Sequence, residues 1–242
     1  MININFKLTR CFAYIFLLSS LVLSSCAVST EGKLPAKAYV TATNDAEIPD
    51  SQQSTPQNSA DVPVNLLGEN LSLNNYSLAI PKGWYFSEVN RPNIHGWIFT
   101  MRDPVITQEN GFIEWAGAFW ALTPLPAGTS AEEFTTSLQS QNFNSGDFSA
   151  LLLAPEQAGL MDLTVAEGLL SGVEISSWGG QPCLKMKGSV NFSGSDNLSL
   201  DTTIILMAIN QDFISYYQFS NSSVTTQVNP LIAASFESFS IN

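Results

Sequence analysis

The chain has 242 residues, of which 45% are apolar and 12% are charged, and its 9 basic and 21 acidic residues give a net charge of −12. The apolar content excludes a wholly disordered chain, and the length suffices for one domain with a sizeable core. The acidic balance, without any basic cluster, excludes a nucleic-acid-binding protein, because such proteins need cations against the phosphates.

Residues 1–25 have the features of an export signal. Lys7 and Arg10 form a short basic region, and the apolar residues 11–23 that follow contain no Asp, Glu, Lys or Arg. A membrane span needs about 20 apolar residues, so this run is too short to cross a bilayer and is typical of a signal peptide. An uncleaved anchor is the alternative interpretation.

The end of this run resembles the lipobox of bacterial lipoproteins and consists of Leu23, Ser24, Ser25 and Cys26. In a lipobox the small residues admit the signal peptidase, and the thiol of the cysteine is alkylated with diacylglycerol. We therefore predict a cleaved signal peptide over residues 1–25 and a covalent diacylglycerol on Cys26, with further acyl chains such as palmitate. An ordinary signal peptide with a chance cysteine is the other interpretation.

Removal of residues 1–25 leaves 7 basic and 21 acidic residues, a net charge of −14. An anionic lipid surface repels such a chain, so the acyl chains must provide the membrane affinity, at about 0.8 kcal/mol per buried methylene. Ala27, rather than Asp, follows Cys26. In a Gram-negative host this residue implies the periplasmic side of the outer membrane.

Residues 26–65 are rich in Ser, Thr, Ala, Gln, Asn, Asp and Pro and cannot form a core. As a flexible coil this tether would span about 35 Å, using about 5–6 Å times the square root of its length. Residues 66–242 contain no repeat of fixed period and are expected to form one domain.

Strand patterns dominate residues 66–242. The expected strands are 76–80, a run from Trp84, 97–101, 113–122, 184–192, 200–209 and 213–219. Alternation of side chains in 113–122 and 184–192 predicts two distinct faces, and one face of 184–192 is polar. Residues 204–209 are apolar on both faces, as in a central strand that is covered on both sides.

Two helices are expected. Ser130 and Glu133 form a capping box, in which each side chain accepts a hydrogen bond from an unpaired backbone amide of the other residue. A second helix lies within residues 225–236, where Pro230 either starts or kinks it. Residues 159–170 fit either a helix or a strand.

Three segments, in this order and spacing, resemble the PsbP-like superfamily. Residues 76–84 are similar to its opening motif, Y-x-hydrophobic-x-hydrophobic-P-x-G-W, and residues 180–183 to its G-x-P-A entry to a strand. The strands 200–209 and 213–219, with a helix into residues 234–239, are similar to its closing S-F segment. The resemblance covers about residues 66–242 and implies an α+β fold, with an antiparallel sheet flanked by helices in an α/β/α sandwich. It also implies a protein that binds partners and assists assembly of larger complexes, rather than an enzyme.

His95 is the only histidine, so any Ser-His or Cys-His dyad would have to use it, and a His-rich zinc site is excluded. We expect His95 to be structural or exposed. Removal of Cys11 and acylation of Cys26 leave Cys183 alone, so no intramolecular disulfide is available. We expect Cys183 to be a buried packing residue rather than a reactive thiol.

Two carboxylate pairs could be nominated for glycosidase chemistry, Glu132 with Glu133 and Glu109 with Glu114. Glu132 and Glu133 are explained by the favourable interaction of negative charge with the first turn of a helix. Glu114 is expected to face solvent by alternation, and the alternative is a buried carboxylate with a raised pKa.

Five tryptophans lie in the domain, and most are expected in its core: Trp84, Trp97, Trp115, Trp120 and Trp178. Trp115 and Trp120 lie on opposite faces of one expected strand, so they cannot both point the same way. Exposed large aromatic side chains tend to mark interaction surfaces, so whichever of the two faces outward is the candidate interaction residue.

These features together predict a lipid-anchored, non-enzymatic protein of the cell envelope that binds a protein partner or assists assembly of a membrane complex. The alternative is an envelope module that binds a small ligand or a glycan, and hydrolysis is a third, weaker hypothesis. Beyond the diacylglycerol on Cys26, we expect no cofactor and no metal ion, and no nucleic acid as partner.

Overall fold

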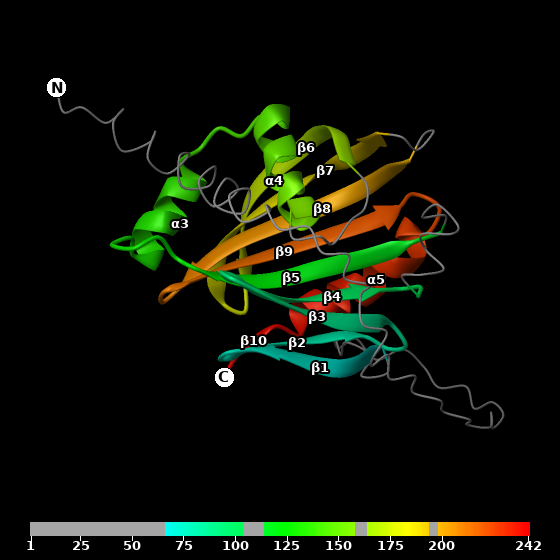
Figure 1. Cartoon of the computed structure of the whole chain (residues 1–242), viewed down its shortest axis with the longest axis horizontal. Coiled ribbons are helices and arrows are strands. Elements are labelled where there is room, and N and C mark those ends of the chain that lie inside the picture. Colours follow the sequence, from blue (N-terminus) through cyan, green and yellow to red (C-terminus); the bar gives the residue numbers. More distant parts are fainter. Residues whose placement is uncertain (1–65, 104–113, 158–163, 194–197) are drawn as a thin grey trace, which may run out of the picture.

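A computed structural model describes residues 66–103, 114–157, 164–193 and 198–242 (Figure 1). The predicted signal peptide, Cys26 and the tether lie outside these residues. Within them the chain forms ten strands and three helices. The strands are β1 (Leu67–Leu73), β2 (Tyr76–Pro81), β3 (Tyr85–Arg91), β4 (Ile94–Thr100), β5 (Ala116–Pro124), β6 (Thr164–Trp178), β7 (Gln181–Ser193), β8 (Ser199–Ile209), β9 (Asp212–Asn221) and β10 (Ser240–Ile241). The helices are α3 (Ala131–Gln139), α4 (Ser145–Gln157) and α5 (Thr225–Glu237).

The strands form two sheets in which every neighbouring pair is antiparallel. The large sheet has the order β3-β4-β5-β9-β8-β7-β6, and the small sheet has the order β1-β2-β10. The predicted fold class, an antiparallel sheet flanked by helices, is confirmed. The division into two sheets was not predicted. The chain passes from the small sheet to the large sheet at the turn between β2 and β3. In this turn Gly83 has a φ of +79°, a value that L side chains rarely adopt.

The middle strands of the large sheet are buried on both faces. Strand β5 places Trp120 and Ala118 in one hydrophobic cluster and Phe119 in the other. Strand β8 divides its apolar side chains in the same way, with Ile205 in the first cluster and Ile204 in the second. The prediction of a covered central strand over 204–209 is therefore confirmed. Two faces are confirmed for residues 116–122, whereas Glu114 and Trp115 precede β5 and Ile113 lies outside the described residues.

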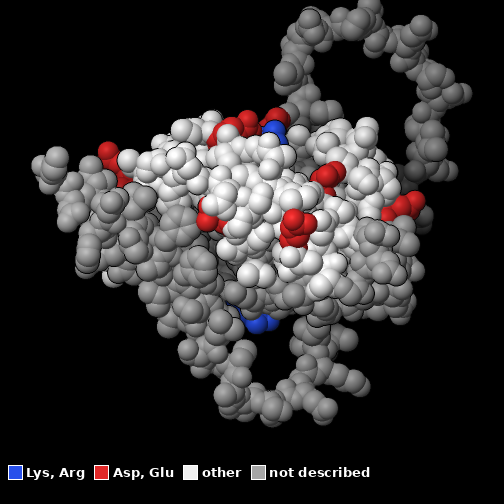
Figure 2. Space-filling model, turned by 90° about the horizontal axis from the view of Figure 1, so that it is seen from above, with Lys and Arg blue, Asp and Glu red and all other residues white. Residues whose placement is uncertain are grey.

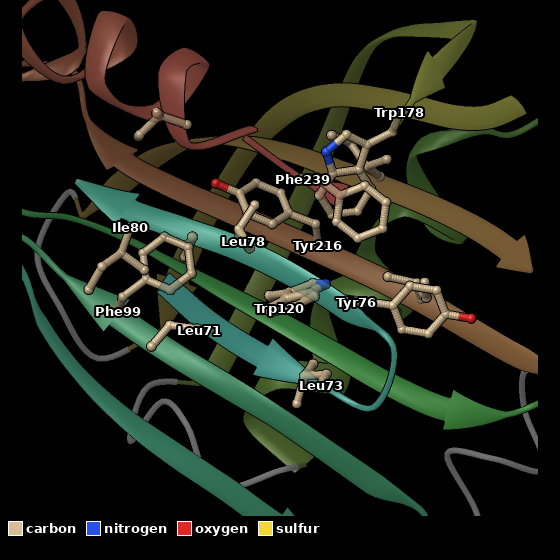
Figure 3. Packing of buried hydrophobic residues seen from close by; sticks show 14 of the residues in the cluster. Leu71, Leu73, Tyr76, Leu78, Ile80, Phe99, Trp120, Trp178, Tyr216 and Phe239 are labelled. Atoms are coloured by element: carbon tan, nitrogen blue, oxygen red, sulfur yellow. The ribbon is translucent and has the colours of Figure 1, made fainter. Parts of the chain in front are cut away.

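The first cluster lies between the large sheet and a layer made of α5 and the small sheet (Figure 3). Phe239, which follows α5, contacts three other aromatic rings of this cluster. It stacks on Trp178 with ring centroids 4.2 Å apart and contacts Tyr76 and Trp120 at 6.1 and 6.2 Å. One side chain near the C-terminus thus packs against strands β2, β5 and β6, which are far apart in the sequence.

The second cluster lies on the opposite face, beneath α3 and α4 (Figure 1). The predicted capping box of α3 is confirmed, since Ser130 Oγ accepts from Glu133 N and Glu133 Oε2 accepts from Ser130 N. Helix α4 was not predicted. It begins with a similar reciprocal pair, in which Asn144 Oδ1 accepts from Asp147 N at 3.0 Å and Asp147 Oδ2 accepts from Asn144 N at 3.1 Å.

The structure decides two alternatives that the sequence left open. Pro230 lies inside α5 and does not start it. The helix begins at Thr225, and no side chain caps its N-terminus. Of the ambiguous residues 159–170, those from Thr164 onward belong to strand β6, and the earlier ones lie outside the described residues.

We expect Phe239→Ala to destabilise the fold strongly, because it removes a ring that is 4% exposed and packed on three other aromatic rings. Loss of a buried Phe side chain costs about 3–5 kcal/mol of unfolding free energy. Urea denaturation of the wild type and the variant measures this difference.

The matched control is Ile241→Ala, two residues further along, where the side chain is 40% exposed. Exposed positions of this kind usually change the unfolding free energy by less than about 0.5 kcal/mol. Equal midpoints for Phe239→Ala and wild type would show that the C-terminal segment does not hold this layer in place.

Candidate functional site

Neither tryptophan that was predicted as an interaction residue is exposed. Trp120 on β5 is fully buried in the first cluster, and Trp115, just before β5, is buried in the second. They lie on opposite faces as predicted. The prediction that one of them faces outward is wrong, because β5 is a middle strand that is covered on both faces.

Trp97 on β4 is the one tryptophan of the five that is partly exposed. Its ring meets Phe86 of β3 edge to face, with centroids 6.0 Å apart, and its Nε1 donates to the carbonyl oxygen of Ser72 at 3.0 Å. Trp97 therefore joins the large sheet to β1 while part of its ring stays at the surface. Its position next to the edge strand β3, rather than its local sequence, makes it accessible.

His95 and Cys183 cannot act together. His95 lies on β4, where its Nε2 is 2.7 Å from Glu88 Oε1 in an exposed pair, while Cys183 is buried on β7. Strands β5, β9 and β8 lie between β4, which carries His95, and β7, which carries Cys183. At about 4.8 Å per strand, β4 and β7 are about 19 Å apart. The expectation of a structural or exposed His95 is confirmed.

Cys183 belongs to the first cluster, with 1% of its surface exposed. Burial raises the pKa of its thiol from 9.0 to about 11, which keeps the thiol protonated at neutral pH. A protonated, enclosed thiol is a poor nucleophile, so the predicted packing role is confirmed.

The nominated carboxylates do not form a site among the described residues. Glu133 caps α3, and Glu132 lies in the same first turn. Glu114 is exposed and accepts a hydrogen bond from Arg102, so its predicted solvent exposure is confirmed and the buried alternative is wrong. Glu109 lies outside the described residues.

The described residues offer neither a metal-binding cluster nor a membrane-spanning helix. Within those ranges, no group of three or more His, Cys, Asp and Glu side chains could hold a metal ion. None of the helices α3, α4 and α5 has the length and apolar run that a membrane crossing requires.

The structure instead exposes apolar side chains on strand β6, at the edge of the large sheet. In the described part of the chain, four large hydrophobic residues are exposed, and three of them lie on β6: Leu169 (43%), Val173 (42%) and Ile175 (64%). Val173 pairs with Met186 and Ile175 with Leu184, so both face the same side of the sheet as the second cluster. Helix α3 packs mainly on the neighbouring strands β7 and β8, which leaves these side chains of β6 exposed.

Helix α4 covers only the first part of β6. The Oγ of Ser149 accepts from Gly168 N at 2.8 Å and lies 3.2 Å from Gly168 O, and the Oγ of Ser145 accepts from Leu170 N at 3.3 Å. These hydroxyls form hydrogen bonds with the outer edge of β6 that the backbone of a neighbouring strand would otherwise form. Beyond Leu170 the strand bulges, and residues 171–177 pair only with β7 within the described residues.

Two lysines compensate the one carboxylate of this stretch. Glu174 of β6 lies opposite Lys185 of β7, and its Oε1 is 3.1 Å from Lys185 Nζ and 3.7 Å from Lys187 Nζ. The hydrogen bond from Lys185 and the charges of both lysines lower the pKa of Glu174, which keeps it ionised. Figure 2 views the molecule from the side on which α4, β6 and β7 lie in Figure 1, and shows acidic residues there separated by uncharged surface.

We name residues 171–177 of β6 the edge segment. It consists of Ser171, Gly172, Val173, Glu174, Ile175, Ser176 and Ser177. Among the described residues no strand pairs with its outer edge, and it carries two exposed apolar side chains and one compensated carboxylate, an arrangement that can accept an extended polypeptide. The sequence did not indicate this site, because exposure here depends on where α4 begins: its first residue, Ser145, lies beside Leu170.

No family model matches the chain, and no curated protein matches it. Among solved structures it is similar to PsbP of the cyanobacterium Synechocystis, with a TM-score of 0.47 and 14% identity over 77% of this chain and 98% of that one. It is also similar to LpqN of Mycobacterium tuberculosis, a protein involved in cell envelope biogenesis, with a TM-score of 0.39 and 14% identity over 69% of this chain and 83% of that one. Both proteins are distant from this chain in sequence.

We expect the unfolding free energy to fall as the pH rises from 9 to 11, in part through Cys183. Over this range the thiol of the unfolded chain loses its proton, whereas the folded chain retains it because burial raises its pKa to about 11. The folded state then binds more protons, so stability decreases with rising pH. The difference between the thiol pKa values of the folded and unfolded chains corresponds to about 3 kcal/mol at most.

The test compares urea unfolding of wild type and Cys183→Ala at several values between pH 7 and 11. Any cavity in the variant lowers its stability equally at every pH, and the other titrating groups are common to both proteins. The wild type should therefore lose stability more steeply above pH 9. Parallel curves would contradict the assignment of this pH dependence to Cys183.

Proposed function

We propose that the chain is a lipid-anchored, non-enzymatic protein of the cell envelope that binds another protein through the edge segment of β6. The observation that carries this proposal is the concentration of exposed apolar side chains on one unpaired strand edge. Such exposure is unfavourable in water, and contiguous exposed apolar surface usually marks an interaction site.

The mode of binding follows from the geometry of the edge. An extended segment of a partner can add a strand to β6 and form backbone hydrogen bonds with it, as in other proteins that bind peptides at a sheet edge. Val173 and Ile175 lie on one face of the strand, so they provide apolar contacts to alternate side chains of the added strand.

The location follows from the sequence. The apolar residues 11–23 and the lipobox that ends at Cys26 support export and lipid anchoring, and residues 26–65 supply a tether of about 35 Å. Ala27 favours the periplasmic side of the outer membrane if the host is Gram-negative. A domain on such a tether can reach partners at or near the membrane surface.

We expect Cys26→Ala to release the protein from membranes. Each buried methylene of an acyl chain contributes about 0.8 kcal/mol, and the remaining chain is acidic, so little affinity for anionic lipids remains without acylation. Fractionation of cells into membrane and soluble material, followed by immunoblotting, measures the change. Membrane association of the variant equal to that of wild type would contradict the lipid anchor.

We expect Ile175→Lys to reduce capture of the protein partner by at least about tenfold, which corresponds to about 1.4 kcal/mol of binding free energy. The substitution places a charge at the most exposed apolar position of the edge segment. Crosslinking in intact cells, capture of the tagged protein and quantitative mass spectrometry measure the partner in each sample.

The matched control is Ile241→Lys, which changes the same residue type at another exposed site, on β10. This variant should capture as much partner as wild type. Equal losses for both variants would remove the edge segment from the proposal. Capture of neither another protein nor an untagged copy of the chain by wild type would favour the small-ligand or glycan alternative, for which Trp97 and Phe86 offer partly exposed rings.

A further inference from the structure

We propose that the edge segment pairs with the edge segment of a second copy of this chain. The two β6 strands lie antiparallel about a two-fold axis at Ile175, so that the two large sheets become one continuous sheet. This inference rests on the proposed function and names its partner.

The edge can accept a strand over a regular stretch. From Gly172 to Trp178 the pairing of β6 with β7 runs without a register shift, from Gly172 opposite Lys187 to Trp178 opposite Gln181. Edge strands that avoid association carry Pro, Lys or a bulge where a neighbour would pair. Residues 172–178 contain neither Pro nor Lys, and the bulge lies before them, between Leu170 and Gly172.

The charges favour a second copy at this position. The chain is acidic, with 21 acidic and 9 basic residues, so two copies repel each other over most of their surface. The edge segment has one charged residue, Glu174, and two lysines of the neighbouring strand form ion pairs with its carboxylate. Two copies therefore approach here without bringing uncompensated carboxylates together.

The side chains of the edge segment favour a two-fold axis at Ile175 over one at Glu174. In an antiparallel pair with the axis at Ile175, this residue lies opposite Ile175 of the second copy, and Glu174 lies opposite Ser176. Val173 and Ile175 of both copies then form one apolar cluster on the same face. An axis at Glu174 would place the two carboxylates directly opposite each other, which is unfavourable.

Membrane attachment increases the occupancy of this contact. A single pair of short strands with two apolar side chains from each copy buries less surface than a standard stable interface, so the contact is weak in dilute solution. Two copies held by lipid anchors on one membrane have a higher effective concentration than free copies. The pairing is therefore a property of the anchored protein and must be tested there.

The test is disulfide crosslinking of the full-length protein in isolated membranes. In Ile175→Cys the two new thiols lie directly opposite each other, with Cα atoms about 4.5–5.5 Å apart, which a disulfide can bridge. In Val173→Cys they lie four residues apart along the strands, at about 14 Å, which a disulfide cannot bridge. The edge control is Asn90→Cys, an exposed position on β3 at the other edge of the same sheet.

Mild oxidation and non-reducing electrophoresis measure the covalent dimer, with wild type as the blank for the native cysteines. We expect a dimer from Ile175→Cys and none above the blank from Val173→Cys or Asn90→Cys. Absence of a dimer from Ile175→Cys would overturn the inference, as would equal dimer from all three variants. If Ile175→Cys forms no dimer while Ile175→Lys still loses a different captured protein, the proposed function stands and the second copy is excluded.

Discussion

The large sheet is wider than the layers that cover it, and this mismatch determines both the core and the surface of the protein. Seven strands at about 4.8 Å place the two outer strands about 29 Å apart, whereas α3 and α4, the two helices on one face, are each only about 10 Å wide. Helices α3 and α4 on one face, and α5 with the small sheet on the other, bury the middle strands β5, β9 and β8. The same apolar residue types become core on β8 and exposed surface on β6, because coverage ends before the edge.

The exposed edge is nevertheless fixed firmly to the core at one end. Trp178, the last residue of β6, is buried, stacks on Phe236 and Phe239, and donates from Nε1 to the carbonyl oxygen of Phe236 at 2.7 Å. Strand β7 holds the rest of the edge segment along its whole length. A binding strand therefore meets a backbone that is already extended, which lowers the entropy cost of association.

The sequence predicts those features that depend on local pattern. Alternation identifies the two faces of β7, and Ser130 with Glu133 identifies the start of α3. Helix α4 was missed because its apolar residues form the continuous run 150–154 rather than a helical spacing, although Asn144 and Asp147 signal its start. The exposed site was missed because it depends on which strand lies at the edge and on where α4 begins along β6. The same long-range information decided that Trp115 and Trp120 are buried.

The ion pairs beside the edge segment bear on the proposed recognition of a partner more than on the stability of the fold. Exposed pairs such as Glu174 with Lys185 and Lys187 add little to the stability of the fold, since water already solvates both charges well. In this acidic chain, Lys185 and Lys187 compensate Glu174, the one negative charge that an added strand would meet at this edge. What remains for a partner is a row of backbone groups and two apolar side chains. Affinity at this edge therefore depends on shape and hydrogen bonding, and it depends less on salt than binding to the acidic remainder of the surface would.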